Sequence, residues 1–189
     1  MATNKKEERS DRSNQTIVYL VRHAIPDSHE ENGHLTAQGY AQAKEISKFF
    51  SHEFSANTKP LLIVSPTVRT LETADPIVEK LGVRPLLHSA FSENYLADTQ
   101  NIFLSPAFLR QHVATHKIIH AFWHAIRSNK GKKIIIVTHG NVIRVLLGKL
   151  FGKSFLQMSK TKVDCGSITQ LAIVGEKAHH VNSGSHLVA

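Results

Sequence analysis

The chain has 189 residues and a formal net charge of +8, and no apolar run approaches the ~20 residues that a membrane-spanning helix needs. This length allows one domain with a sizeable core. The first fourteen residues mix Lys, Glu, Ser and Asn, and they lack the apolar segment of a secretory signal. We therefore expect a disordered polar tail at 1–14 and a single domain at 15–189.

Cysteine is scarce, because Cys165 is the only one and no intrachain disulfide can form. The absence of disulfides and of a secretory signal fits a reducing compartment, and we predict a cytoplasmic location. No motif places a base beside Cys165, so we expect a packed thiol and not a nucleophile.

The positive charge is concentrated in one stretch, residues 99–163, which holds eleven Lys and Arg and not one Asp or Glu. Such a stretch projects a field that attracts anions. It is explained by a solvated basic face, by steering of a phosphorylated substrate, or by docking to an acidic protein or anionic membrane. Nucleic acid is disfavoured, since no recognised module or interleaving of aromatic and basic residues is present.

Strand-like and helix-like segments alternate along the chain. We predict strands at 16–21, 61–64, 84–88, 132–139 and 167–174, and a short edge strand at 177–183. We predict helices at 35–50, 67–82, 106–129 and 141–152. Thr36 is the expected N-cap of the first helix, Pro76 a kink or break in the second, and Gly82 its stop. The alternation predicts an α/β fold, a three-layer sandwich with a mainly parallel central sheet flanked by helices.

Three predicted strands end in polar residues. The first ends at Arg22 and His23, the second runs into a segment with Arg69, and the third ends at His139. Because ligands bind at the carboxyl ends of parallel strands, we expect these side chains to converge. Guanidinium groups grip phosphate oxygens in pairs, and an imidazole can attack phosphorus. The strand ends therefore predict a phosphate site.

These residues lie in motifs that resemble the histidine phosphatase superfamily, the phosphoglycerate-mutase-like fold: VRHA, LTAQGYAQA, SPTVRTLETA, VTHGNVIRVLL and GSITQLAI. The resemblance implies a metal-independent phosphatase without a cofactor. His23 would become phosphohistidine. Arg22, Arg69 and His139 would hold the phosphate, His139 also counting among the catalytic residues. Glu93 would act as the catalytic acid and then activate water.

The chain departs from the family pattern at two points. Ala24 stands where a glycine usually follows the nucleophile. The family often places an asparagine soon after the nucleophile, and here no residue is clearly in register; the candidates are Asp27, Ser28, His29 and Asn32.

Substrate class stays open. The short chain suggests an open pocket, and its C-terminal half resembles the compact branch that includes the mitochondrial protein serine/threonine phosphatase. A phosphoprotein is therefore one expected substrate, and a sugar or metabolite phosphate is the alternative. A mutase, or a scaffold that binds phosphate without turnover, is a further alternative.

Some residues have no role in this scheme. Asn141 is expected to cap the helix at 141–152, and Arg144 to be solvated or structural. Four histidines recur at every fourth position, which suggests a polar helix face, a metal pair or a face that gains charge near pH 6: His112, His116, His120 and His124.

Overall fold

The structure is a computed structural model that describes residues 15–28, 30, 32–55, 58–93, 106–154, 157–158 and 160–185. Side chains are described in these ranges except at 106–112 and 180–185. The predicted tail at 1–14 lies outside the described residues. Across the described part, none of the helices combines the length and apolarity that a membrane crossing requires.

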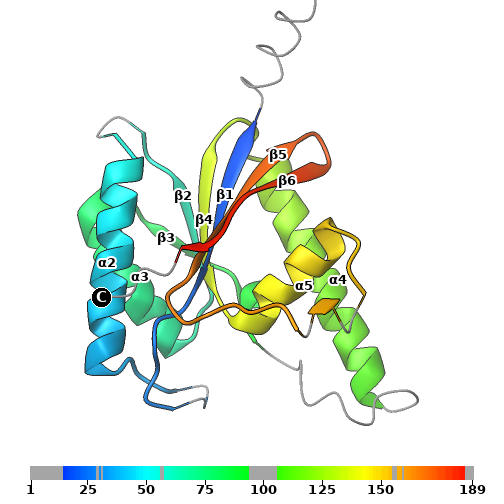
Figure 1. The fold of residues 1–189 in the computed structure, drawn as a ribbon, viewed down its shortest axis with the longest axis horizontal. Helices are drawn as coiled ribbons and strands as arrows, with labels where there is room; N and C mark the ends of the chain where they lie inside the picture. Colours follow the sequence, from blue (N-terminus) through cyan, green and yellow to red (C-terminus); the bar gives the residue numbers. More distant parts are fainter. Residues whose placement is uncertain are drawn as a thin grey trace, which may run out of the picture.

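One mixed sheet of six strands forms the centre of the molecule, in the order β3-β2-β4-β1-β5-β6 (Figure 1). The strands are β1 (Thr16–Arg22), β2 (Leu61–Val64), β3 (Pro85–Leu87), β4 (Lys133–Thr138), β5 (Ile168–Val174) and β6 (Lys177–Ser185). The first four are mutually parallel, while β5 pairs antiparallel with β1 and β6 pairs antiparallel with β5. The predicted, mainly parallel sheet and its edge strand are thus confirmed.

Helices cover both faces of the sheet and make a three-layer sandwich (Figure 1). Helices α2 (Ala37–Glu53) and α3 (Val68–Leu81) lie on one face, and α4 (Pro106–Arg127) and α5 (Gly140–Leu150) lie on the other. Alternation along β1 explains both layers, since successive side chains of a strand point to opposite faces. Val18 and Leu20 belong to the core under α4 and α5, and Tyr19 and Val21 to the core under α2 and α3.

The helix boundaries follow the predicted signals with two differences. Thr36 caps α2 by accepting a hydrogen bond from the Gly39 N–H at 3.0 Å, and Gly82 ends α3 in the left-handed region at φ 59°. Helix α3 continues through Pro76, so the proline does not break it. The prediction for Asn141 is wrong: α5 begins at Gly140, and its N-cap is His139.

Strand register brings the polar strand ends together. Arg22 on β1 pairs with Thr138 on β4, and Val64 on β2 pairs with Val137. The residues that follow these positions therefore leave the sheet at one edge. The carboxyl ends of β1, β2 and β4 form the floor of a site.

Candidate active site

His23 lies directly after β1, and its backbone N–H donates to the Thr138 carbonyl at 2.9 Å. Its ring is almost fully buried. The Nδ1 atom lies 2.9 Å from the Ala24 carbonyl oxygen, which can only accept, so Nδ1 carries the proton. The opposite nitrogen, Nε2, is then an unprotonated base with a free electron pair.

Burial keeps His23 neutral. Desolvation lowers the pKa of His23 to about 3, and this outweighs the hydrogen bond to Ala24, which favours the charged form. The charges of Arg22, Arg69 and a protonated His139 act in the same direction as burial. A neutral imidazole with a fixed tautomer is the form in which a histidine acts as a nucleophile.

The guanidinium of Arg22 has one nitrogen with a hydrogen-bond partner and one buried nitrogen without a partner in the described part of the chain. Its Nη1 donates to the Val163 carbonyl at 2.7 Å, while its Nε is buried without a hydrogen-bond partner among the described residues. A Cβ at position 140 would lie 3.2 Å from that Nε, so Gly140 leaves the space that the guanidinium occupies. A buried donor without a partner is costly, which suggests that a bound anion completes it.

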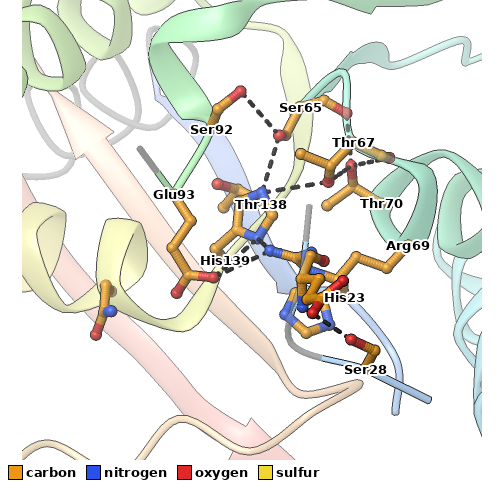
Figure 2. Close-up of polar contacts among 12 residues, drawn as sticks. His23, Ser28, Ser65, Thr67, Arg69, Thr70, Ser92, Glu93, Thr138 and His139 are labelled. Carbon is orange, nitrogen blue, oxygen red and sulfur yellow. Dashed lines mark hydrogen bonds and ion pairs between the residues drawn. The ribbon is translucent and has the colours of Figure 1, made fainter. Parts of the chain in front are cut away.

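Arg69 enters the site from the first turn of α3 and is also buried. Its Nη1 donates to the Glu30 carbonyl at 2.7 Å, and its Nη2 lies 3.2 Å from both Glu93 Oε2 and His139 Nδ1. Figure 2 shows Arg69, Glu93 and His139 converging beside His23. One guanidinium therefore joins three chain segments.

His139 is fully buried and faces His23 with 5.3 Å between the ring centroids. Because a guanidinium only donates, Nδ1 of the neutral ring accepts from Arg69 and Nε2 carries the proton, whereas Nδ1 of the charged ring donates to Glu93. Nε2 then donates to the Ser65 hydroxyl at 2.9 Å, with the Thr67 hydroxyl at 3.5 Å. Burial lowers the pKa of His139 despite the raising effect of Glu93.

Glu93 is placed by the short helix η1 (Ser89–Phe91), which is tied to the sheet because Thr138 donates its hydroxyl to the Phe91 carbonyl at 2.6 Å. The side chain of Glu93 is 35% exposed, and its Oε2 lies 3.5 Å from His139 Nδ1. Burial raises the pKa of Glu93, but the interaction with His139 and the charge of Arg69 outweigh it and lower the pKa to about 2. Glu93 is thus a carboxylate in the free site.

A metal ion is a second occupant to consider. His23, Glu93 and His139 each offer one ligand atom, and these atoms lie within 4.8 Å of one another. However, Arg69 donates to two of these three groups, and Arg22 lies nearby. The two permanent guanidinium charges oppose a cation and favour an anion with several oxygens.

The structure brings together all five predicted site residues: Arg22, His23, Arg69, Glu93 and His139. The sequence did not reveal the hydroxyls and the carbonyl that orient them. Ser65 and Thr67 stand beside His139 at the end of β2, and Glu30 contributes only its backbone. The position of Ser65, directly after a buried strand, was a usable signal.

No asparagine side chain of the loop after His23 contacts the site among the described residues, but the loop does contact the predicted phosphate clamp through its backbone. Its contact with Arg69 comes from the Glu30 carbonyl, and Ser28 supports that residue because its hydroxyl accepts from the Glu30 N–H at 3.0 Å. Asp27 and Asn32 are exposed, and His29 lies outside the described residues.

The histidines of α4 and Cys165 lie outside the site. His116, His120 and His124 are exposed on α4, with the last two rings stacked at 6.4 Å, and the side chain of His112 lies outside the described residues. Cys165 is half-buried, and burial raises the pKa of its thiol, which agrees with a packed and unreactive residue.

Proteins of known name resemble this chain in structure or in sequence. A phosphoserine phosphatase mutant from Entamoeba histolytica, solved with phosphoserine, superposes with a TM-score of 0.73 at 19% identity, covering 92% of this chain and 100% of that one. A mycobacterial glucosyl-3-phosphoglycerate phosphatase gives 0.68 at 17% identity, covering 88% and 97%. A curated protein of Hydrogenobacter thermophilus, named "Putative phosphoserine phosphatase 2", is 22% identical and covers 85% of this chain and 91% of its own length.

The family model described as Histidine phosphatase superfamily (branch 1) matches residues 18–105 and 111–184. These ranges include every strand end that builds the site. The phosphoglycerate-mutase-like fold and the activity of a phosphoric monoester hydrolase both agree with this match. By this evidence the chain belongs to the histidine phosphatase superfamily.

Proposed function

We propose that the protein hydrolyses phosphomonoesters through a phosphohistidine at His23, without a metal ion. The observation that carries the proposal is a free His23 Nε2 beside two guanidiniums, of which Arg22 has a buried Nε without a hydrogen-bond partner among the described residues. Arg22 and Arg69 would bind the phosphate oxygens and leave the phosphorus facing the imidazole.

In the first step, the Nε2 electron pair forms a bond to phosphorus, and the bond from phosphorus to the ester oxygen breaks. Arg22, Arg69 and His139 would stabilise the charge on the phosphoryl oxygens. The leaving oxygen needs a proton. Phosphate binding would draw Arg69 away from Glu93 and place negative charge beside the carboxylate, which raises the pKa of Glu93; Glu93 would then take a proton from solvent and deliver it to the leaving oxygen.

In the second step, water attacks the phosphohistidine, and the bond between nitrogen and phosphorus breaks. Glu93, now ionised again, would take the proton of the water. Inorganic phosphate leaves, and His23 returns to its neutral form with Nδ1 still donating to Ala24.

The substrate class is a second part of the proposal. A phosphoprotein, as in the compact mitochondrial branch, and a small metabolite phosphate both remain candidates. Phosphoserine is the first probe, because the Entamoeba structure and the Hydrogenobacter relative carry that substrate in their names. A cytoplasmic location, and docking of an anionic partner on residues 99–163, stay predictions.

The test is hydrolysis of phosphoserine, a phosphopeptide and an aryl phosphate in EDTA by wild type, His23→Ala and the exposed-histidine control His124→Ala. We expect EDTA-resistant activity that only His23→Ala abolishes, and an acid-labile phosphoenzyme trapped by rapid quench. Loss of activity in EDTA that Zn²⁺ restores would overturn the mechanism. Phosphate binding without turnover would instead indicate a scaffold.

A further inference from the structure

A third arginine, Arg144, lies on the same side of α5 as the phosphate site. Gly140 and Arg144 are four residues apart and therefore share one face of the helix. A Cβ at position 140 would lie 3.2 Å from Arg22 Nε. Since Cβ atoms four residues apart on a helix are ~6 Å apart, the Arg144 Cβ lies within about 9 Å of that atom.

The same segment of chain holds both guanidiniums. Arg22 donates to the Val163 carbonyl at 2.7 Å, and Arg144 Nε donates to the Thr161 carbonyl at 2.8 Å. These carbonyls are two residues apart. The segment that follows α5 thus fixes Arg22 and Arg144 as neighbours at the edge of the site.

Arg144 has only neutral partners. Besides Thr161, its Nη1 donates to the Asn141 side-chain oxygen at 2.8 Å, and no carboxylate pairs with it among the described residues. It is half-buried, and burial, followed by the charge of Arg22, lowers the pKa of its guanidinium, while the charge of Glu93 raises it. The exposed Lys160 and Lys162 flank Thr161, and Lys160 adds to the positive field, whereas Lys162 pairs with Asp164 at 3.3 Å.

A half-buried guanidinium that feels the charge of Glu93 but donates its hydrogen bonds only to neutral groups can still pair with an anion. We infer that Arg144 forms a second anion subsite, which binds a carboxylate or a second phosphate that the substrate carries beyond its reacting phosphate. The inference rests on the proposed function because it assumes a phosphate ester as substrate. The subsite itself is tested by ligand affinity and not by turnover. The preferred substrates would then be small phosphate esters with a second anionic group, or phosphorylated side chains with an acidic residue beside them.

The experiment compares ligands that differ in one group. 3-Phosphoglycerate and glycerol 3-phosphate differ by a carboxylate, and the bisphosphate and monophosphate of 1,3-propanediol differ by a second phosphate. Calorimetry in a His23→Ala background measures binding without turnover. We expect the member with the second anionic group to bind about tenfold more tightly in at least one pair, and Arg144→Gln to remove that preference.

Arg144→Lys should keep part of the preference, because it keeps the charge. Arg127→Gln is the matched control, since Arg127 is an exposed arginine whose partner is Glu176. A preference within the first pair would show that the subsite binds a carboxylate, and a preference within the second pair would show that it binds a phosphate. Equal binding within both pairs, or equal weakening of both members by Arg144→Gln, would overturn the inference in favour of a structural role.

Kinetics separate this inference from the function on which it rests. If wild type hydrolyses both members of each pair with the same kcat/KM, the hydrolase stands and the subsite falls. If wild type hydrolyses neither these esters nor phosphoserine, the phosphopeptide and the aryl phosphate, but binds with the Arg144-dependent preference, the subsite stands and the proposed hydrolysis falls.

Discussion

The Glu93 carboxylate lies 3.2 Å from Arg69 Nη2, the nitrogen that also reaches His139. In the free site the proposed acid therefore neutralises part of the proposed phosphate clamp. A substrate phosphate that takes this nitrogen releases the carboxylate and at the same time makes it more basic. Binding and proton delivery are thus linked through one guanidinium.

Glu93→Gln removes the proton donor but keeps the shape of the side chain. We expect the rate of phosphoenzyme formation from an alkyl phosphate to fall about 10²–10³-fold, because an alkoxide is a poor leaving group. For 4-nitrophenyl phosphate, whose leaving group needs no proton, the fall in this first step should be far smaller. Rapid-quench kinetics on the two esters measure the first step apart from the water step that both share, and an equal loss on both would show that Glu93 only positions Arg69.

His23 makes stability depend on pH. Its pKa is lowered to about 3, so the unfolded chain, with a histidine pKa near 6.5, binds more protons than the folded chain below that value. Folding stability is therefore lost as pH falls through 6.5. Between pH 7 and pH 5.5 this histidine alone should remove about 1 kcal/mol from the free energy of unfolding.

Urea denaturation at the two pH values checks this sign. The His23→Gln variant should lose less stability on acidification than wild type. His34→Gln is the opposite control: the hydrogen bond to Glu72 raises the pKa of His34, so this side chain stabilises the fold more at low pH. His34→Gln should therefore lose more stability than wild type, and an equal pH slope in all three proteins contradicts the argument.

Glu72 ties the loop after the nucleophile to the helix that carries Arg69. Its two oxygens lie 2.7 Å from His34 Nδ1 and from the Leu35 N–H. Glu72→Gln should loosen the loop that places the Glu30 carbonyl on Arg69, and raise KM several-fold with a smaller change in kcat. Glu45→Gln, which breaks only the exposed pair with Lys48, is the control that should leave both constants unchanged.

Gly140→Ala tests the space beside Arg22. The added methyl would lie 3.2 Å from Arg22 Nε and displace a guanidinium that Val163 holds. We expect kcat/KM to fall about three- to tenfold, although alanine favours the helix and thermal stability should not decrease. A variant that loses stability and activity together would show that the glycine serves the fold and not the site.

The sequence allowed the site to be predicted where side chains follow strand ends. His23 and His139 are far apart in the chain, but parallel pairing of β1 with β4 makes them neighbours, and the motif of each strand end identified them. The Glu30 carbonyl could not be predicted, because a backbone contact has no side-chain signature. The cap of α5 was misassigned for a physical reason: Asn141 caps well by propensity, but the extended backbone at His139 starts the helix earlier.

Arg144 shows the limit of pattern reading. A lone arginine on a helix predicts a solvated or structural residue, and its neutral partners became visible only when the segment at 161–163 was placed against it. Glu93 was predicted only through the resemblance to the family, because no strand end identifies it. Its position is explained by the structure, in which Thr138 donates a hydrogen bond to the Phe91 carbonyl.

The turn between α4 and β4, at 128–132, connects two parts of the chain that each carry an incomplete set of groups. His23, Arg69 and Glu93 precede it, while His139 and Arg144 follow it, and it joins the amino end of β4, opposite the site. A chain divided there would yield two fragments that are inactive apart and active when β4 inserts between β1 and β2. If each fragment were fused to one of two proteins, binding of those proteins would reassemble the site, and hydrolysis of a chromogenic phosphate would report the binding.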